Sequence, residues 1–108
     1  MTEQEFKRKA DDALAALNRL LVAAADDYGY EVDFHAGALT IEFEDPPAKF
    51  VISPNTPPRQ LWVSARAKSY KLDWDEVAAA FADPQSGETL KDLMERVIGE
   101  QIHGEVSL

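Results

Sequence analysis

Closely spaced carboxylates are the residues in this sequence whose type and spacing most directly suggest chemistry. One adjacent pair of aspartates has no basic residue within four positions, and two later pairs of acids stand at alternate positions of successive segments. Acids at alternate positions of a strand share one face, and like charges that face each other across neighbouring strands repel. A cation would relieve this repulsion, and oxygen-only ligands favour Ca²⁺, Mg²⁺, Mn²⁺ or iron over zinc. The pattern therefore predicts an open, weak metal site formed by Asp26, Asp27, Glu31, Asp33, Glu42 and Glu44.

Trp62 is the second residue that suggests a function. The segment Gln60–Arg66 alternates, and its apolar face consists of Leu61, Val63 and Ala65. Trp62 then lies on the opposite face of the strand. It shares that face with Gln60, Ser64 and Arg66. An exposed tryptophan among polar and basic neighbours is typical of a binding anchor. The alternative is a tryptophan shielded by a neighbouring loop.

The composition excludes several kinds of catalytic and metal site. The chain has no cysteine, which excludes disulfides, thiolate zinc sites, clusters held by its own thiolates and a cysteine nucleophile. With only two histidines, His35 and His103, a histidine-based zinc site is not expected. There is no glycine-rich phosphate loop and no G-x-S-x-G sequence. We therefore expect a protein that is not an enzyme.

The charge is large and unevenly distributed. The net charge is −9, but residues 46–72 carry five basic residues and no acid, while the flanking segments carry −7 each. An acidic surface repels nucleic acid and anionic lipid, and it attracts cations and basic protein surfaces. A charge that serves only solubility is the alternative. No apolar run is long enough to span a membrane and no leader sequence is recognisable, so we expect a cytoplasmic protein.

The elements that must position these residues follow from the periodicity of apolar residues. A capping box at Thr2–Glu5 predicts a helix that runs to about residue 25, and a second amphipathic helix is predicted over residues 88–103. Alternation predicts strands over residues 30–35, 39–44, 49–53, 60–66 and 69–73. Pro54 is assigned to a stiff loop because proline does not fit inside a central strand. Residues 74–85 fit either a helix or a short edge strand near Phe81.

This order of elements predicts an α+β fold of a single domain over residues 1–108. Runs of strands joined by short turns imply an antiparallel sheet, here of five or six strands. Two helices with one apolar face each can cover only one side of that sheet. We expect a two-layer α/β sandwich in which the N- and C-terminal helices run roughly antiparallel and the other face of the sheet is solvated. The expected core includes Leu14, Leu17, Leu21, Leu61, Val63, Leu93 and Val97.

Several stretches, in order along nearly the whole chain, resemble the bacterial, CyaY-type branch of the frataxin family. The most diagnostic is a proline followed by Gln-x-Trp on a central strand, which corresponds here to Pro57–Ala65. The other stretches are Thr2–Phe6, Gly37–Glu44 and Ser86–Leu90. The resemblance implies a protein of iron–sulfur cluster assembly that binds Fe²⁺ and Fe³⁺ weakly through an acidic ridge. It also implies docking on a cysteine desulfurase and a scaffold protein, as a monomer or as an iron-dependent oligomer.

The resemblance also indicates which residues would serve these roles. The ridge positions that keep an acid are Glu3, Asp11, Asp27, Glu31, Asp33 and Glu44, and the family's exposed Gln-x-Trp corresponds to Gln60 and Trp62. Except for Glu44, these residues form the expected partner surface. The last turns of the first helix lack the usual acids and carry Asn18, Arg19, Val22 and Ala23 instead. This departure moves the expected metal ligands toward residues 26–44, with Asp11 as the one candidate ligand on the middle of the helix.

Two other functions compete with an iron-binding regulator. One is a metal-independent interaction module whose acids only dock a basic partner enzyme. The other is a weak ferroxidase, which needs two irons held by bridging carboxylates. The depleted ridge makes the ferroxidase the least favoured of the three.

Overall fold

The first helix, α1 (Glu3–Tyr28), begins and ends as its flanking residues dictate. The hydroxyl of Thr2 accepts a hydrogen bond from the backbone N–H of Glu5 at 3.1 Å, which satisfies one free donor of the first turn. At the other end, Gly29 adopts a left-handed conformation (φ 73°), and its N–H donates to the carbonyl of Ala25. The helix thus runs three residues beyond the predicted end, because Gly29 is the first residue that takes this conformation easily.

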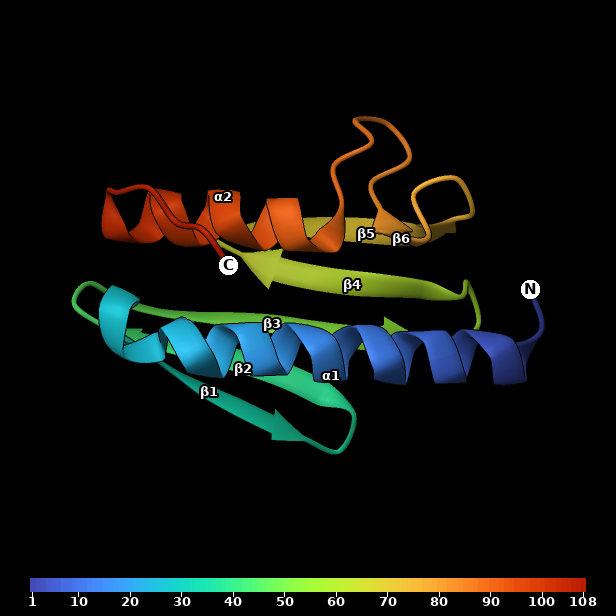
Figure 1. Ribbon diagram of the computed structural model, residues 1–108, viewed down its shortest axis with the longest axis horizontal. Helices are drawn as coiled ribbons and strands as arrows, with labels where there is room; N and C mark the ends of the chain where they lie inside the picture. The colour runs from blue at the N-terminus through green and yellow to red at the C-terminus, as the bar shows by residue number, and fades with distance from the viewer.

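The computed structural model, which describes residues 1–108, contains one six-stranded sheet and two helices, and the six strands lie between the helices in chain order (Figure 1). The strands are β1 (Tyr30–His35), β2 (Ala38–Glu44), β3 (Pro47–Asn55), β4 (Gln60–Ala65), β5 (Lys68–Asp75) and β6 (Ala80–Ala82). They pair in sequence order, and every pair is antiparallel. This meander makes β1 and β6 the two edges of the sheet. It confirms the predicted antiparallel α+β sandwich.

The second helix, α2 (Leu90–Ile102), lies beside α1 on the same face of the sheet (Figure 1). The prediction that the helices run antiparallel is wrong, since both run in the same direction. The last turn of α2 reaches the β2–β3 turn, where Gln101 Nε2 donates to the carbonyl of Pro46 at 3.0 Å. Tyr28, at the end of α1, is hydrogen-bonded to Ser107 at the same end of the molecule. The loop after β6 leaves the sheet and returns beside Ala82, so that α2 runs in the same direction as β6. Helix α1 also runs in this direction.

One continuous apolar core lies between the helices and the sheet. All seven expected core residues are buried, as the alternation and the helical spacing predicted. Phe81 settles the ambiguity of residues 74–85 in favour of an edge strand, because its ring packs between Phe6 and Trp74, with centroids 6.0 and 5.3 Å away. No helix combines the length and the hydrophobicity needed to cross a bilayer.

Pro54 lies inside strand β3, contrary to the prediction that it belongs to a loop. Strand β2 pairs with β3 only as far as Leu39 opposite Ile52, whereas Pro54 pairs with Leu61 of β4. At this point β3 has a neighbour on one side only. A missing N–H is tolerated there because no ladder hydrogen bond is required on the open side.

Candidate functional site

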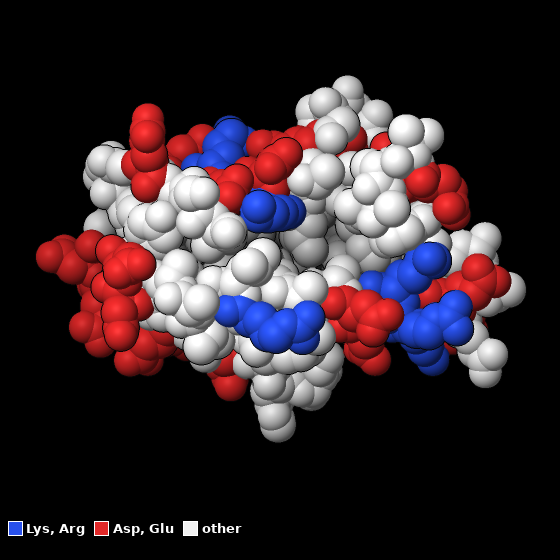
Figure 2. Space-filling model, in the orientation of Figure 1, with Lys and Arg blue, Asp and Glu red and all other residues white.

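An acidic surface gathers where α1 ends and β1 begins. Figure 2 shows acidic side chains massed at this end of the molecule. The register places Glu31 of β1 directly opposite Glu42 of β2, which confirms that carboxylates face each other across the two strands. On its other side Glu42 is paired with Lys49 of β3, the basic residue of this row. The negative charge of the pair is therefore compensated only in part.

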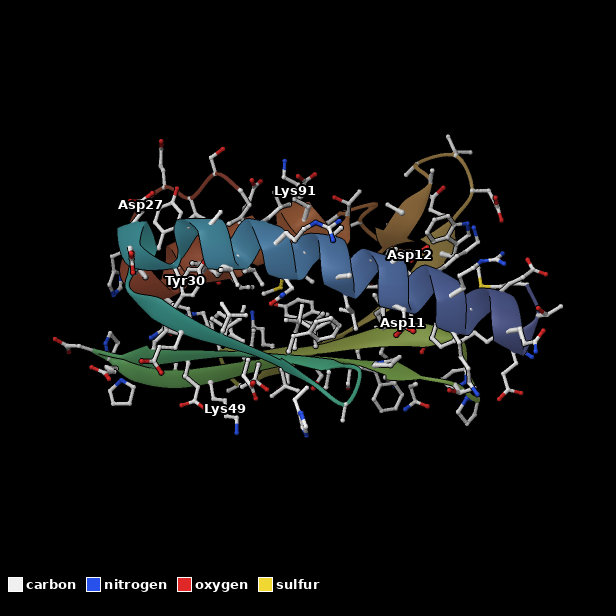
Figure 3. All side chains as sticks on the ribbon, turned by 60° about the horizontal axis from the view of Figure 1, so that its bottom comes forward. Asp11, Asp12, Asp27, Tyr30, Lys49 and Lys91 are labelled. Atoms are coloured by element: carbon white, nitrogen blue, oxygen red, sulfur yellow. The ribbon has the colours of Figure 1, made fainter.

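Asp26 and Asp27 leave the end of α1 in different directions. Successive residues of a helix are about 100° apart, and the helix continues through both aspartates to Tyr28. Asp27 lies near Tyr30, at the start of β1 (Figure 3). Burial of the Tyr30 hydroxyl, together with the nearby Tyr28 and Asp27, raises the pKa of this phenol to about 12. This hydroxyl donates to the carbonyl of Leu21 at 2.7 Å, which ties the start of β1 to the helix.

The remaining expected metal ligands are dispersed. Asp33 is opposite Thr40, and Glu44 is opposite Pro47, so neither faces another acid. No three Asp, Glu, His or Cys side chains come close enough together to hold one metal ion. The arrangement offers pairs of carboxylates on an open surface, such as Glu31 with Glu42. Such pairs can bind a hard cation weakly and can attract a basic surface.

Asp11 and Glu3 lie too far along α1 to join this cluster. At 1.5 Å per residue, Asp11 is about 24 Å and Glu3 about 36 Å from Asp27 along the helix axis. Figure 3 shows Asp11 and Asp27 well separated on the same helix. Glu3 is paired with Lys7 at 3.3 Å. The acidic ridge that the family resemblance implies is therefore divided in the structure into an acidic end and two separate acids on α1.

Trp62 lies on the solvated face of the sheet, as expected, with 37% of its surface exposed. Its indole Nε1 donates to Oε1 of Gln60 at 3.0 Å. The Gln60 side chain donates in turn from Nε2 to Oδ1 of Asp73, also at 3.0 Å. Lys71 places its Nζ 4.9 Å from the centre of the indole ring. A shallow hollow of about 210 Å³ adjoins the ring, lined in part by Ser53, Ser64, Ser69 and Tyr70.

Asp73 and Lys71 were not among the residues expected at this site. The register of β4 and β5 brings them there, because Trp62 pairs with Lys71 and the next position on that face of β5 is Asp73. Pairing the predicted strands 60–66 and 69–73 across the short turn between them would have placed both residues beside Trp62.

Arg66 does not share the face of Trp62, and that prediction is wrong. Strand β4 ends at Ala65, and Arg66 and Ala67 form a two-residue turn with φ of 52° and 63°. The turn directs the Arg66 guanidinium to the helical layer, where Nη1 donates to Oε1 of Gln101 at 2.7 Å. Arg66 therefore joins the β4–β5 turn to α2 instead of contributing to a binding surface.

An apolar groove of about 580 Å³ separates α1 from β6 and the start of α2. Trp74 forms part of its wall, and Lys9 covers this ring with Nζ 4.2 Å from its centre. The Trp74 Nε1 is buried and has no hydrogen-bond partner. The groove is lined mainly by small and aliphatic side chains, among them Ala13, Ala16, Leu17 and Leu20.

Two parallel helices on one face of a six-stranded antiparallel meander, with an acidic end and a tryptophan on the open face, define a frataxin-type α+β sandwich. The chain belongs to the frataxin-like family, whose domain model matches residues 1–104.

Curated relatives and a solved structure agree with this assignment. An iron–sulfur cluster assembly protein CyaY from Ralstonia nicotianae is 32% identical, over 100% of this chain and 95% of that protein. The protein of the same name from Pseudomonas syringae is 34% identical, over 94% of this chain and 89% of that protein. The frataxin structure from Psychromonas ingrahamii superposes with a TM-score of 0.84, covers 99% of this chain and 97% of that one, and shares the fold at 22% identity.

Proposed function

We propose that this protein is a non-enzymatic, iron-binding adaptor of iron–sulfur cluster assembly in the cytoplasm. It binds Fe²⁺ and Fe³⁺ weakly through carboxylates of the acidic end, and it docks on a complex of cysteine desulfurase and scaffold protein. The role in cluster assembly is supported by the names of its curated relatives. The observation that carries the iron proposal is Glu31 opposite Glu42, a carboxylate pair with one lysine beside it.

The geometry favours transient over tight iron binding. Two opposed carboxylates provide up to four oxygen atoms, and water completes the coordination of a hard cation at such an open site. Asp33 follows Glu31 on the same face of β1 and is the next acid along that strand, whereas Asp27 leaves α1 beside Tyr30 and Asp11 lies farther along the helix. A weakly held ion suits a protein that passes iron to a partner instead of storing it.

An anaerobic titration with Fe²⁺, followed by NMR, tests the iron proposal. Paramagnetic broadening confined to residues 26–44 is the expected result. The acids of the loops before and after β6, Glu76, Asp83 and Glu88, provide an internal comparison because they are also exposed or partly exposed and acidic. Broadening that is equal at the two groups of acids, or centred on Asp11, would contradict the proposed site.

A metal-independent docking module is the second candidate function. It is favoured by the observation that no three ligands converge on one position. The two functions differ in how docking responds to a chelator. If iron occupancy contributes to docking, a strong chelator weakens binding to the purified desulfurase–scaffold complex. Unchanged binding in chelator, together with no localised broadening by Fe²⁺, would favour the docking module.

A further inference from the structure

Strand β1 presents an open and regular sheet edge. It pairs only with β2, over six successive residue pairs without a bulge, and contains neither proline nor lysine. Figure 1 shows β1 as the outermost strand, with no further strand beside it. Soluble proteins usually block such edges with proline, lysine, bulges or covering loops, because an open edge is a template for another strand. The only blocking feature of β1 is its acidic side chains.

The turn that follows β1 determines which main-chain groups face outward. Ala36 and Gly37 form a two-residue turn with φ of 52° and 80°, which makes His35 and Ala38 a hydrogen-bonded pair. Hydrogen-bonded and non-hydrogen-bonded pairs alternate along an antiparallel ladder. Phe34 and Val32 are therefore non-hydrogen-bonded positions, whose N–H and C=O groups point away from β2. An added strand would find these groups free.

The side chains beside this edge differ between its two faces. On the helical face, Phe34 is 37% exposed and Val22 of α1 is 56% exposed. Leu20 lines the groove beside β6, and residues two apart on a helix are about 200° apart, so Val22 lies on the flank toward β1. On the solvated face, Glu31 and Asp33 are both exposed. The edge thus offers apolar contacts on one face and negative charge on the other.

A second copy of this chain does not suit the edge. Pairing two β1 strands would bring two sets of Glu31 and Asp33 together, in a protein with a net charge of −9. Like charges on adjacent strands repel each other, so the acids prevent self-association while leaving the main chain free. Lysine or arginine side chains of an added strand, placed beside Glu31 and Asp33, would be attracted instead.

We infer that the β1 edge binds a basic, extended segment of a partner protein as a seventh strand, with its basic side chains over Glu31 and Asp33 and its apolar ones over Val32 and Phe34. Main-chain pairing supplies affinity and the alternating side chains supply specificity, as in other complexes formed by strand addition. The inference rests on the proposed docking function, and it specifies how the acidic end recognises a basic surface.

A capped eight-residue peptide that alternates lysine and valine is the probe. Amide hydrogen exchange should slow at Val32 and Phe34 when the peptide binds, whereas the amides of Glu31 and Asp33, already bonded to β2, should change little. An attraction that is only electrostatic gives no such alternation. Slowing at Val32 and Phe34 without peptide, increasing with protein concentration, would assign the edge to a second copy and overturn the inference.

Two isomers of the peptide provide a sharper test. One is N-methylated at two valines and the other at two lysines, so charge and composition are the same. In an antiparallel complex the valine amides face β1, and in a parallel complex the lysine amides do. Strand addition therefore predicts that one isomer binds at least about tenfold more weakly than the unmodified peptide and that the other does not. Equal affinities of the two isomers would overturn the inference.

Substitutions of Val32 test the same contact from the protein side. Val32→Pro removes an outward N–H, which an edge strand tolerates, and Val32→Ala loses similar packing but keeps the N–H. Peptide binding should be weaker in the proline variant than in the alanine variant.

If both peptide tests fail while the desulfurase–scaffold complex still binds, docking stands without strand addition. If the peptide results hold and the complex does not bind, the proposed function fails and the edge site remains.

Discussion

The indole Nε1 of Trp62 donates a hydrogen bond to Oε1 of Gln60, and both side chains stand on the open face of strand β4. Because Gln60 also donates to Asp73 on β5, the exposed ring is held by contacts with two strands. Lys71 lies over the ring from the same neighbouring strand. An exposed side chain that is already fixed loses little conformational freedom when a partner covers it. The ring is therefore already ordered for the docking role that is proposed for this protein.

Replacement of Trp62 by alanine should separate binding from stability. Because the ring lies outside the core, Trp62→Ala should leave the thermal midpoint nearly unchanged. Loss of a buried interface tryptophan costs about 2–4 kcal/mol, so affinity for the desulfurase–scaffold complex should fall by roughly 30-fold or more. Binding assays and thermal melts of the same preparations check both expectations.

Two further variants serve as controls for Trp62. Thr40→Ala alters the same sheet face at a distant position and should change neither property. Gln60→Leu removes both hydrogen bonds of the glutamine but keeps the indole, and should weaken binding by less than Trp62→Ala does. If Trp62→Ala unfolds the protein, the ring has a structural role; if binding is unchanged, the tryptophan takes no part in docking.

The facing acids could be predicted because local rules determine them. Alternation assigns Glu31 and Glu42 to one face, and a two-residue turn at Ala36 and Gly37 leaves a single register for the hairpin. The burial of Leu61 and Val63, and with it the exposure of Trp62, followed from the same alternation. These features depend on residues that are close in sequence.

Other features depend on distant parts of the chain and escaped prediction. The directions of Asp26 and Asp27 diverge because α1 continues to Tyr28, and the shared direction of the helices depends on how the loop after β6 returns to Ala82. The role of Arg66 required knowledge of Gln101, a residue 35 positions away. The exposure of Phe34 required knowing which strand forms the edge of the sheet.

Neutralising two acids of the acidic end should weaken iron binding and slightly stabilise the fold. In the double variant Asp27→Asn with Glu31→Gln, the repulsion between Glu31 and Glu42 is removed, which should add some tenths of a kcal/mol to the free energy of unfolding. Affinity for Fe²⁺, measured anaerobically by calorimetry, should decrease. The matched control, Asp12→Asn with Glu76→Gln, changes the net charge equally at two exposed acids outside the acidic end. Equal iron affinity in the two double variants would place the site elsewhere.

Gln101 should be important for stability although it is polar. Its buried amide accepts from Arg66 and donates to the carbonyl of Pro46, and so joins α2 to two turns of the sheet. Gln101→Met keeps the volume but leaves both partners without this amide, and should lower the free energy of unfolding by about 2 kcal/mol. Urea denaturation measures the change. A loss below about half a kcal/mol would mean that water replaces the amide at both partners.

Ala67→Gly should make the protein more stable. Ala67 is exposed and has a φ of 63°, a left-handed conformation that costs an alanine about 1–2 kcal/mol and a glycine little. After the greater flexibility of glycine in the unfolded chain is subtracted, a gain of about 0.5–1 kcal/mol remains. The same substitution at Ala78, which is exposed without a positive φ, should give no gain. If glycine stabilises the protein at neither position, the turn holds Ala67 without strain.

Tyr30 should make stability depend on pH in the alkaline range. Its hydroxyl is buried against the carbonyl of Leu21, and burial with the neighbouring Tyr28 and Asp27 raises its pKa from 10.0 to about 12. The unfolded chain releases this proton at the lower value, so the contribution of Tyr30 is complete below pH 10 and is lost as the pH rises through about 12. Tyr30→Phe cannot titrate and loses one hydrogen bond, which costs about 1 kcal/mol at neutral pH.

The stability of the two proteins should therefore converge as the pH rises above 10 and then cross, because a pKa difference of about two units outweighs the one hydrogen bond that Tyr30→Phe loses. Urea denaturation at several pH values measures this convergence, and the ultraviolet absorbance of tyrosinate identifies the group. One tyrosine should ionise late in the native protein, and Tyr30→Phe should remove that transition. A constant difference in stability between the proteins across this range would mean that another group causes the alkaline loss, because only a titrating Tyr30 makes the difference depend on pH.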